Sequence, residues 1–189
     1  MRYVIGVMML SLARLYHAYL FVLIIIGVDQ ITKLIMLAMI FDPPRVIVIL
    51  PFFNLAPVYN TGVSFGLFSQ SGIWGLVILS CLALAVGLLL PYISRNWLRF
   101  QRWGAIMMAG GALGNAIDRM LWGKVVDFID LHFSGWHWPA FNIADSAIVI
   151  GVGCIIFSAW RYNPDEHDPD EHNQDKHDQD KKDSLSAPK

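Results

Sequence analysis

Two aspartates, Asp127 and Asp145, are the residues of this chain whose type and placement best suit chemistry. Two carboxylates that lie close together cannot both ionise cheaply, so one pKa rises and the pair shares a proton. Such a pair provides a general base and a general acid in one site, which is the equipment needed to activate water against an amide. Whether the two residues meet depends on the elements that carry them.

Other kinds of catalytic site lack support in the sequence. Ser64, Ser134 and Ser146 have no convincing His or Lys base, and Gly-x-Ser-x-Gly is absent. His-Glu-x-x-His and clustered histidine ligands are absent too, which argues against a metal protease. Cys81 and Cys154 lie inside apolar runs and are interpreted as small buried hydrophobes. No basic stripe suited to nucleic acid is present.

The composition is typical of a membrane protein, with 56% hydrophobic residues and a mean hydropathy of +0.49. The charges are unevenly placed, because nine of the 15 acidic residues follow residue 163. The six that remain in residues 1–163 are all aspartates: Asp29, Asp42, Asp118, Asp127, Asp130 and Asp145. Carboxylates are costly inside a bilayer, so each of these requires a structural or functional reason.

Four stretches are long enough to cross a bilayer, which takes about twenty apolar residues. They are residues 16–37, 73–93, 103–120 and 141–160. The third stretch is the shortest and is rich in glycine, which allows helix backbones to approach closely. We therefore expect the third helix to lie centrally in the bundle.

The rest of the chain divides into three pieces. Residues 1–15 are interpreted as an uncleaved N-terminal extension, because no small-residue cleavage site follows the hydrophobic core. The outer loop 41–68 is rich in β-branched and aromatic residues, which favours short strands. Residues 163–189 hold a charged five-residue repeat without aromatics, typical of a disordered tail. The predicted fold is an all-α membrane protein, with four transmembrane helices in residues 16–162 and a small extracytoplasmic β platform.

Lysine and arginine in the short loops predict the orientation in the membrane. Most lie before the first span, between the second and third, or directly after the fourth: Arg2, Arg14, Arg95, Arg99, Arg102 and Arg161. Both termini are therefore predicted to be cytoplasmic, with loops 38–72 and 121–140 on the outside. This topology brings the remaining polar residues to one zone, the outer boundary of the bilayer.

Helical spacing predicts which side chains meet in that zone. Asn115, Asp118 and Arg119 share one face at the outer end of the third span, because they lie at i, i+3 and i+4. Asn142 and Asp145 begin the fourth span, three residues apart. The first span and the first outer loop contribute Asp29, Lys33, Asn60 and Gly62. The outer loop between the third and fourth spans carries Asp127, the other member of the candidate catalytic pair.

Most of these residues also have a structural explanation. Asp29 and Lys33 can form an ion pair inside the bundle. Asp118 and Arg119 can tie helix ends together as readily as they can contact a substrate. Local roles fit three others: Asn60 as a turn residue, Asn142 as a helix cap and Asp130 as a loop residue. Asp127 and Asp145 fit such structural explanations least well.

Five motifs follow one another between about Gly27 and Gly151. They are Val28-Asp29-Gln30-x-Thr32-Lys33, Tyr59-Asn60-Thr61-Gly62-x-Ser64-Phe65-Gly66, Gly110-Gly111-Ala112-Leu113-Gly114-Asn115-x-x-Asp118-Arg119, Val126-Asp127-Phe128 and Phe141-Asn142-x-Ala144-Asp145-Ser146. In this order they resemble the motifs of lipoprotein signal peptidase, the type II signal peptidase of bacteria. Five motifs in register make the resemblance specific, although each alone would be weak.

The resemblance implies an aspartic peptidase of the bacterial inner (cytoplasmic) membrane, with four transmembrane helices and an extracytoplasmic β cradle. Such an enzyme cuts signal peptides from prolipoproteins just before a diacylglyceryl-modified cysteine. It implies Asp127 and Asp145 as the catalytic pair at the outer leaflet boundary, without a metal or cofactor. The candidates for lining the site are Asp29, Lys33, Asn60, Gly62, Asn115, Asp118, Arg119 and Asn142. Expected partners are lipid-modified prolipoproteins and membrane lipids, and the expected state is a monomer.

Alternatives remain at the level of the sequence. Asp118 rivals Asp127 for the first position of the pair, because Asn-x-x-Asp-Arg is an equally distinctive motif. We prefer Asp127, because Asp118 has Arg119 adjacent and a paired carboxylate shares a proton less well. Two other classes of function remain possible from the sequence. One is a proton-coupled carrier that uses Asp29, Lys33 and Asp118, and the other is a non-enzymatic scaffold. Carriers usually place charges near the midplane, in internal repeats, whereas these polar groups gather at one face.

Overall fold

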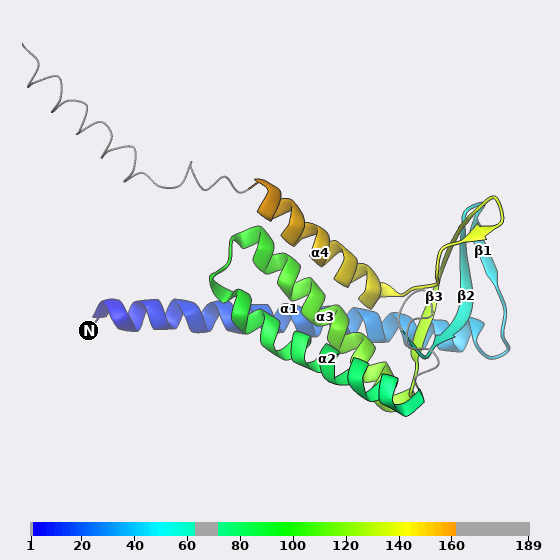
Figure 1. Cartoon of the computed structure of the whole chain (residues 1–189), viewed down its shortest axis with the longest axis horizontal. Helices are drawn as coiled ribbons and strands as arrows, with labels where there is room; N and C mark the ends of the chain where they lie inside the picture. Colours follow the sequence, from blue (N-terminus) through cyan, green and yellow to red (C-terminus); the bar gives the residue numbers. More distant parts are fainter. Residues whose placement is uncertain (1, 63–71, 162–189) are drawn as a thin grey trace, which may run out of the picture.

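The computed structural model describes residues 2–62 and 72–161, which form a helical bundle with a small sheet at one end (Figure 1). The helices are α1 (Arg2–Ile40), α2 (Gly72–Ile93), the 3₁₀ helix η2 (Ser94–Asn96), α3 (Arg99–Trp122) and α4 (Ile143–Arg161). Within these ranges, three stretches are long and apolar enough to span a membrane, at 11–40, 72–96 and 143–161. Four spans were predicted. The helix that falls short is α3, because Asn115, Asp118 and Arg119 make its C-terminal end polar.

Helix α3 lies at the centre of the bundle and contacts the other three helices, as the sequence predicted. Many of its buried residues are small: Gly104, Ala105, Ala109, Gly110, Gly111, Ala112, Gly114 and Ala116. These small residues let the backbones approach closely. A Cβ atom on Gly104 would lie 2.5 Å from the carbonyl oxygen of Gly151 in α4, and one on Gly110 would lie 2.7 Å from Cβ of Ile25 in α1.

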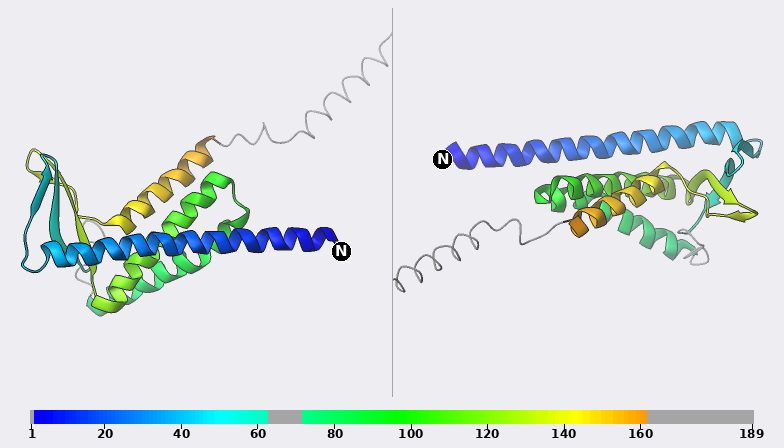
Figure 2. Two further views of the ribbon diagram at one scale, coloured as in Figure 1. Left: turned by 180° about the vertical axis from the view of Figure 1, so that it is seen from behind. Right: turned by 90° about the horizontal axis from the view of Figure 1, so that it is seen from above.

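Helix α1 is continuous over 39 residues. It therefore runs through residue 15, where the sequence suggested the end of a separate extension. Its N-terminal end projects beyond the other helices, and its C-terminal end reaches the sheet (Figures 1 and 2). At 1.5 Å per residue, Asp29 lies roughly 16 Å before the end of the helix. That depth matches the level at which α4 begins, as the contacts of the site show below.

The sheet is antiparallel, in the order β1-β2-β3-β4. Its strands are β1 (Ile47–Leu50), β2 (Phe53–Asn60), β3 (Val125–Phe133) and β4 (Trp136–His137). The prediction of strands within the outer loop 41–68 is confirmed by β1 and β2. Strand β3 was missed, and the interpretation of Asp130 as a loop residue was wrong. The β-branched and aromatic side chains of VVDFIDLHF were the available signal.

Strand β3 joins α3 to α4 and fixes both ends of the site. Its pairing with β2 places Asp127 opposite Val58. The chain then returns, and backbone hydrogen bonds between Ile129 and Phe141, at 2.8 and 3.1 Å, hold the start of α4 against β3. Asp127 and the first turn of α4 are thereby brought together. Three motif residues and the charged tail lie outside the described ranges: Ser64, Phe65, Gly66 and residues 163–189.

Candidate active site

Asp127 is fully buried on β3 and is held by two amide side chains. Asn142 donates to Oδ1 at 2.7 Å, and Asn60 donates to Oδ2 at 3.0 Å. Asn60 also accepts a hydrogen bond from the backbone N–H of Gly62 at 3.0 Å, which makes it the turn residue that the sequence predicted. The same side chain therefore shapes the end of β2 and supports Asp127.

Asp145 lies in the first turn of α4 and is half-buried. Its Oδ1 accepts a hydrogen bond from the Asn115 side chain at 2.7 Å, and its Oδ2 accepts one from the backbone N–H of Asn142 at 3.3 Å. In return, Oδ1 of Asn142 accepts from the backbone N–H of Asp145 at 2.9 Å. This reciprocal pair is a capping box that begins the helix. The positive end of the helix dipole also favours a carboxylate here.

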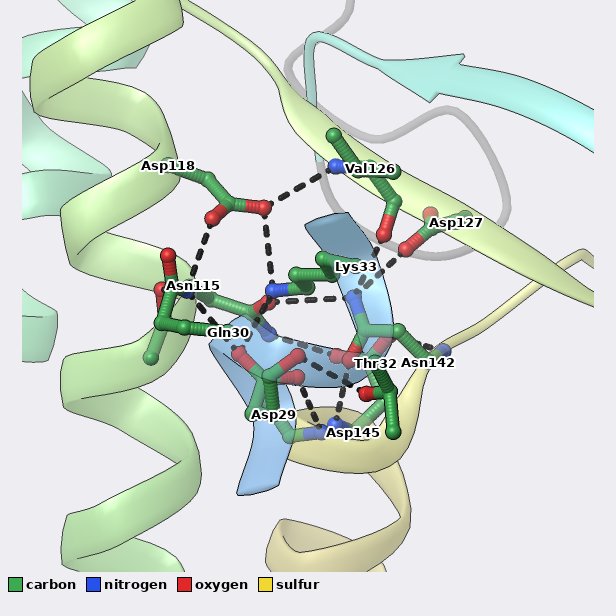
Figure 3. A network of polar contacts seen from close by, with 12 residues as sticks. Asp29, Gln30, Thr32, Lys33, Asn115, Asp118, Val126, Asp127, Asn142 and Asp145 are labelled. Atoms are coloured by element: carbon green, nitrogen blue, oxygen red, sulfur yellow. Dashed lines mark hydrogen bonds and ion pairs between the residues drawn. The ribbon is translucent and has the colours of Figure 1, made fainter. Parts of the chain in front are cut away.

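Asn142 joins the two aspartates (Figure 3). Its side-chain oxygen is committed to capping α4, so its NH₂ group must face the other way. That group donates to Asp127 at 2.7 Å and to Oδ1 of Asn115 at 3.1 Å. The prediction that Asn142 caps the helix is confirmed, and the cap orients the amide toward Asp127. We call Asp127 and Asp145 the aspartate pair.

The pKa of Asp127 is raised to about 7. Burial is the main cause, because it penalises the charged form, and the negative charge of Asp145 adds to it. Hydrogen bonds from Asn60 and Asn142 favour the carboxylate but do not offset these effects. Near neutral pH, Asp127 therefore holds a proton for much of the time while it lies beside a second carboxyl group.

A buried ion cluster lies next to the pair and consists of Asp29, Gln30, Lys33 and Asp118. Lys33 is only 2% exposed and uses its three protons on Asp29 at 2.8 Å, Asp118 at 2.9 Å and Oδ1 of Asn115 at 3.0 Å. The predicted ion pair between Asp29 and Lys33 is confirmed. The pairing suggested for Asp118 with Arg119 was wrong, because Asp118 instead binds Lys33 and Gln30.

The ion cluster also holds the backbone of the site. Oδ1 of Asp29 accepts from the N–H of Ala144 at 2.9 Å, directly before Asp145. Oδ2 of Asp118 accepts from the N–H of Val126 at 3.0 Å, directly before Asp127. Each of these two carboxylates thus holds the residue that precedes one member of the aspartate pair, and Figure 3 shows the contact between Asp118 and Val126.

Gln30 was missed as a site residue, although it stands inside the first motif. Its side-chain NH₂ donates to Asp118 at 2.9 Å, Asp29 at 3.1 Å and the carbonyl oxygen of Gly114 at 3.2 Å. The available signal was its position beside Asp29 on a helix with few polar residues. Gly114 is required here, because a Cβ atom on it would lie 2.6 Å from Oδ2 of Asp29.

Arg119 forms no ion pair with the ion cluster among residues 2–62 and 72–161. Its Nη2 donates to the carbonyl oxygen of Gly62 at 2.9 Å, which ties α3 to the end of β2. Its Nε is buried and forms no hydrogen bond within residues 2–62 and 72–161. A buried guanidinium donor of this kind is available for a carbonyl oxygen of a bound chain.

Two apolar grooves reach Asp145. One has a volume of about 460 Å³ and is walled by the segment before α4 and by α4 itself, including Phe141, Val149 and Ile150. The other, about 270 Å³, lies between α2, α3 and α4 and also reaches Arg119. A carboxyl group that lines two apolar grooves, as Asp145 does, suits an extended or lipid-bearing substrate better than a small polar one.

Taken together, the site offers a partly protonated carboxyl group, a second carboxylate, oriented amides and a spare guanidinium donor. This set can activate a water molecule and protonate an amide. Within residues 2–62 and 72–161, no group of three or more His, Cys, Asp or Glu side chains could hold a metal ion.

Comparison with known proteins gives a consistent result. The family model described as signal peptidase (SPase) II matches residues 21–161. A lipoprotein signal peptidase from Paraburkholderia phymatum is 42% identical over 140 residues, which cover 73% of this chain and 84% of that protein. One from Thermodesulfovibrio yellowstonii is 40% identical over 146 residues, covering 76% and 95%.

Solved structures agree with the sequence relatives. A bacterial membrane enzyme determined by the in meso method superposes with a TM-score of 0.65 at 30% identity, covering 77% of this chain and 88% of that one. A second such structure gives a TM-score of 0.63 at 29% identity, covering 78% and 94%.

Proposed function

This chain belongs to the signal peptidase II family, and from that premise we propose that it is a membrane aspartyl endopeptidase whose catalytic residues are Asp127 and Asp145. Membership of this family indicates a protease that removes signal peptides from prolipoproteins in a bacterial membrane. The proposed cut lies just before a diacylglyceryl-modified cysteine. The arrangement of Asn142 carries the proposal, because this one residue caps Asp145 and donates to Asp127.

The two aspartates take different roles at the start of the reaction. Asp145 sits at the positive end of α4 and acts as the base that removes a proton from the attacking water. Asp127, whose pKa is raised to about 7, donates its proton to the oxygen of the scissile carbonyl. The water oxygen bonds to the carbonyl carbon as the C=O double bond opens. The tetrahedral intermediate then breaks its C–N bond as the amine leaves with the proton that Asp145 had accepted. One hydroxyl group of the intermediate returns its proton to Asp127 as the C=O bond re-forms, which restores both carboxyl groups to their starting states.

Neutral donors around the pair hold the reacting groups. Asn60, Asn115 and Asn142 orient the carboxyl groups, and the spare Nε–H of Arg119 is placed to bind a substrate carbonyl. The two grooves offer apolar room for the acyl chains and for the signal peptide. A substrate that stays in the membrane explains why the site is bounded by helix faces rather than by a soluble domain.

We propose the following topology. Helix α3 crosses the membrane as a fourth span, since its 24 residues reach roughly 36 Å and its polar outer end is covered by other helices. Both termini are cytoplasmic, and the pair lies at the outer leaflet boundary of the inner membrane. Residues 16–162 form the peptidase unit, with an extension at 1–15 and a tail at 163–189. The proposed oligomeric state is a monomer.

The test is cleavage of a diacylglyceryl-modified precursor by purified variants in lipid bicelles. Asp127→Asn and Asp145→Asn should each lower the rate at least about a thousandfold, because each removes a proton-transfer group. Asp42→Asn is the matched control, because it replaces a carboxylate by an amide in the same way at an exposed aspartate.

The outcomes separate the possible roles. Melting temperatures of the variants that are no lower than that of the wild type would assign the loss to chemistry. Full activity in Asp127→Asn would overturn its role and move it to Asp118. Absence of cleavage by the wild-type protein would reject the peptidase proposal and leave a carrier or a scaffold.

A further inference from the structure

A separate cavity lies at the other end of the bundle, between the N-terminal half of α1 and the start of α3. It has a volume of about 360 Å³. Its apolar walls include Phe21, Trp103 and Ile106, and Arg14 and Arg102 also line it. The rings of Phe21 and Trp103 pack edge to face at 4.6 Å, which fixes the apolar wall.

This cavity is remote from the aspartate pair. Arg14 precedes Asp29 by 15 residues on α1, which is roughly 22 Å of helix. Arg102 precedes Asn115 by 13 residues on α3, roughly 20 Å. The apolar stretch of α1 begins at Ser11, three residues before Arg14, and Arg102 lines the same cavity as Arg14. In the proposed topology, both arginines therefore stand near the edge of the membrane opposite the site.

The two arginines lack acidic partners in the described part of the chain, where neither forms an ion pair. The sequence contains no aspartate or glutamate in residues 1–28 or 93–117. His17 also lines the cavity, but its Nδ1 is hydrogen-bonded to the carbonyl oxygen of Ala13 at 2.6 Å. The cavity therefore combines two uncompensated guanidinium groups with an apolar wall.

We propose that this cavity binds an anionic phospholipid, with its phosphate at Arg14 and Arg102 and an acyl chain against Phe21, Trp103 and Ile106. Basic pockets between transmembrane helices are suited to anionic headgroups, and guanidinium matches the geometry of phosphate. The acidic repeat at residues 164–183 is the other occupant to consider. Apart from proline it has no apolar side chain, so it would leave the wall of the cavity unfilled.

Binding is measured by native mass spectrometry of the full chain released from neutral detergent. The probe is dioleoyl phosphatidylglycerol, and dioleoyl phosphatidylcholine with the same chains is the reference lipid. Wild type should retain phosphatidylglycerol preferentially. The double variant Arg14→Gln/Arg102→Gln should bind it about tenfold to thirtyfold more weakly, since each basic group near anionic lipid contributes about fivefold.

The matched control is Arg99→Gln/Arg161→Gln, which removes the same charge from exposed residues at the same end of the bundle. It should weaken binding less than about twofold. Equal losses in the two double variants would overturn the site, because generic surface attraction would then explain them. Equal retention of phosphatidylcholine by the wild type would overturn it as well.

Two further arms identify the occupant. Inorganic phosphate at millimolar concentration should not displace the lipid, and full displacement would show a small-anion site instead. A full-length variant whose nine tail carboxylates are replaced by amides should bind lipid like the wild type. A several-fold rise in its lipid binding would show that the tail occupies the cavity, and would overturn the proposal.

Discussion

The ion cluster and the aspartate pair place four aspartates in one network but give them different surroundings. In the cluster, Lys33 contacts both Asp29 and Asp118, at 2.8 and 2.9 Å. In the pair, no cation lies within ion-pairing distance of Asp127 or Asp145 among residues 2–62 and 72–161. The hydrogen bonds to the pair come from neutral amides.

The difference separates carboxylates that are paired with a cation from carboxylates that are held by neutral amides. The ammonium group of Lys33 contacts the carboxylates of Asp29 and Asp118 directly, and each of them also accepts a hydrogen bond from a backbone N–H group. Neutral amides position Asp127 without supplying a compensating charge, so its pKa stays raised and it can hold a proton. Asn115 separates the two regions, because its oxygen faces Lys33 and its NH₂ group faces Asp145.

Removing the cation should break the cluster with the largest effect. Lys33→Met leaves two buried carboxylates without a positive charge, and we expect a loss of about 3–5 kcal/mol in the free energy of unfolding. Thermal unfolding in detergent measures it. Lys124→Met, which removes a cation 3.4 Å above the ring of Tyr59, should cost no more than about 1 kcal/mol.

A compensating variant tests the reason for that loss. Adding Asp29→Asn and Asp118→Asn to Lys33→Met should recover much of the stability, because no unpaired charge then remains. If the triple variant is no more stable than Lys33→Met alone, the charges are not the cause.

The orienting amide of the pair can be removed while the helix cap is kept. Serine is a good N-cap residue, so Asn142→Ser should hold the start of α4 but lose the hydrogen bond to Asp127. We expect roughly a hundredfold lower cleavage rate, from loss of a positioning donor. The melting temperature should change by only a few degrees, and an unchanged cleavage rate would contradict the role of Asn142.

The contact between α3 and the ion cluster can be disturbed by one methyl group. In Gly114→Ala the new Cβ meets Oδ2 of Asp29 at 2.6 Å, so Asp29 must shift away from Ala144. We expect a loss of about 1–3 kcal/mol in unfolding free energy. Gly153→Ala in α4 is the matched control, because a Cβ there has no atom within 4 Å. Equal stability of the two variants would show that the close approach is dispensable.

The raised pKa of Asp127 predicts a smaller effect that depends on pH. Its pKa is about 7 in the folded protein and 3.8 in the unfolded chain, so the contribution of this group to stability falls as pH rises from about 4 through 7. Asp127→Asn removes that penalty. Its melting temperature relative to wild type should therefore rise by roughly 5 °C between pH 5 and pH 8. Asp42→Asn should show no such rise, and a constant difference for Asp127→Asn would contradict the raised pKa.

The sequence predicted much of the helical framework but less of the sheet. The apolar runs gave the second and fourth helices to within one or two residues, because helix length in a membrane is set by hydropathy. Strand β3 was missed, because Asp127, Asp130 and His132 interrupt its apolar residues and because its partner β2 lies more than sixty residues away in the sequence. The continuity of α1 through residue 15 was also missed. The charge of Arg14 suggested the end of an N-terminal extension, although one helix runs through it.

The sequence predicted which residues gather at the site. It did not predict which of them form ion pairs and hydrogen bonds with one another. Spacing placed Asn115, Asp118 and Arg119 on one helix face, and topology placed them near Asp127 and Asp145. A helical face cannot tell which of two neighbouring residues turns toward a partner on another helix. Asp118 turned toward Lys33 of α1, and Arg119 turned toward Gly62.

The sequence by itself determined the membrane character, the number and types of polar groups and their gathering at one end of the bundle. These follow from hydropathy and from the covalent order of the chain. Only the tertiary structure decided which aspartates receive the cation. That choice depends on the close approach of α1 to α3 at Gly114, which brings Lys33 within reach of Asp118 and leaves the aspartate pair to neutral amides. Charge compensation acts over a few ångströms, and such distances are set by packing rather than by spacing along the chain.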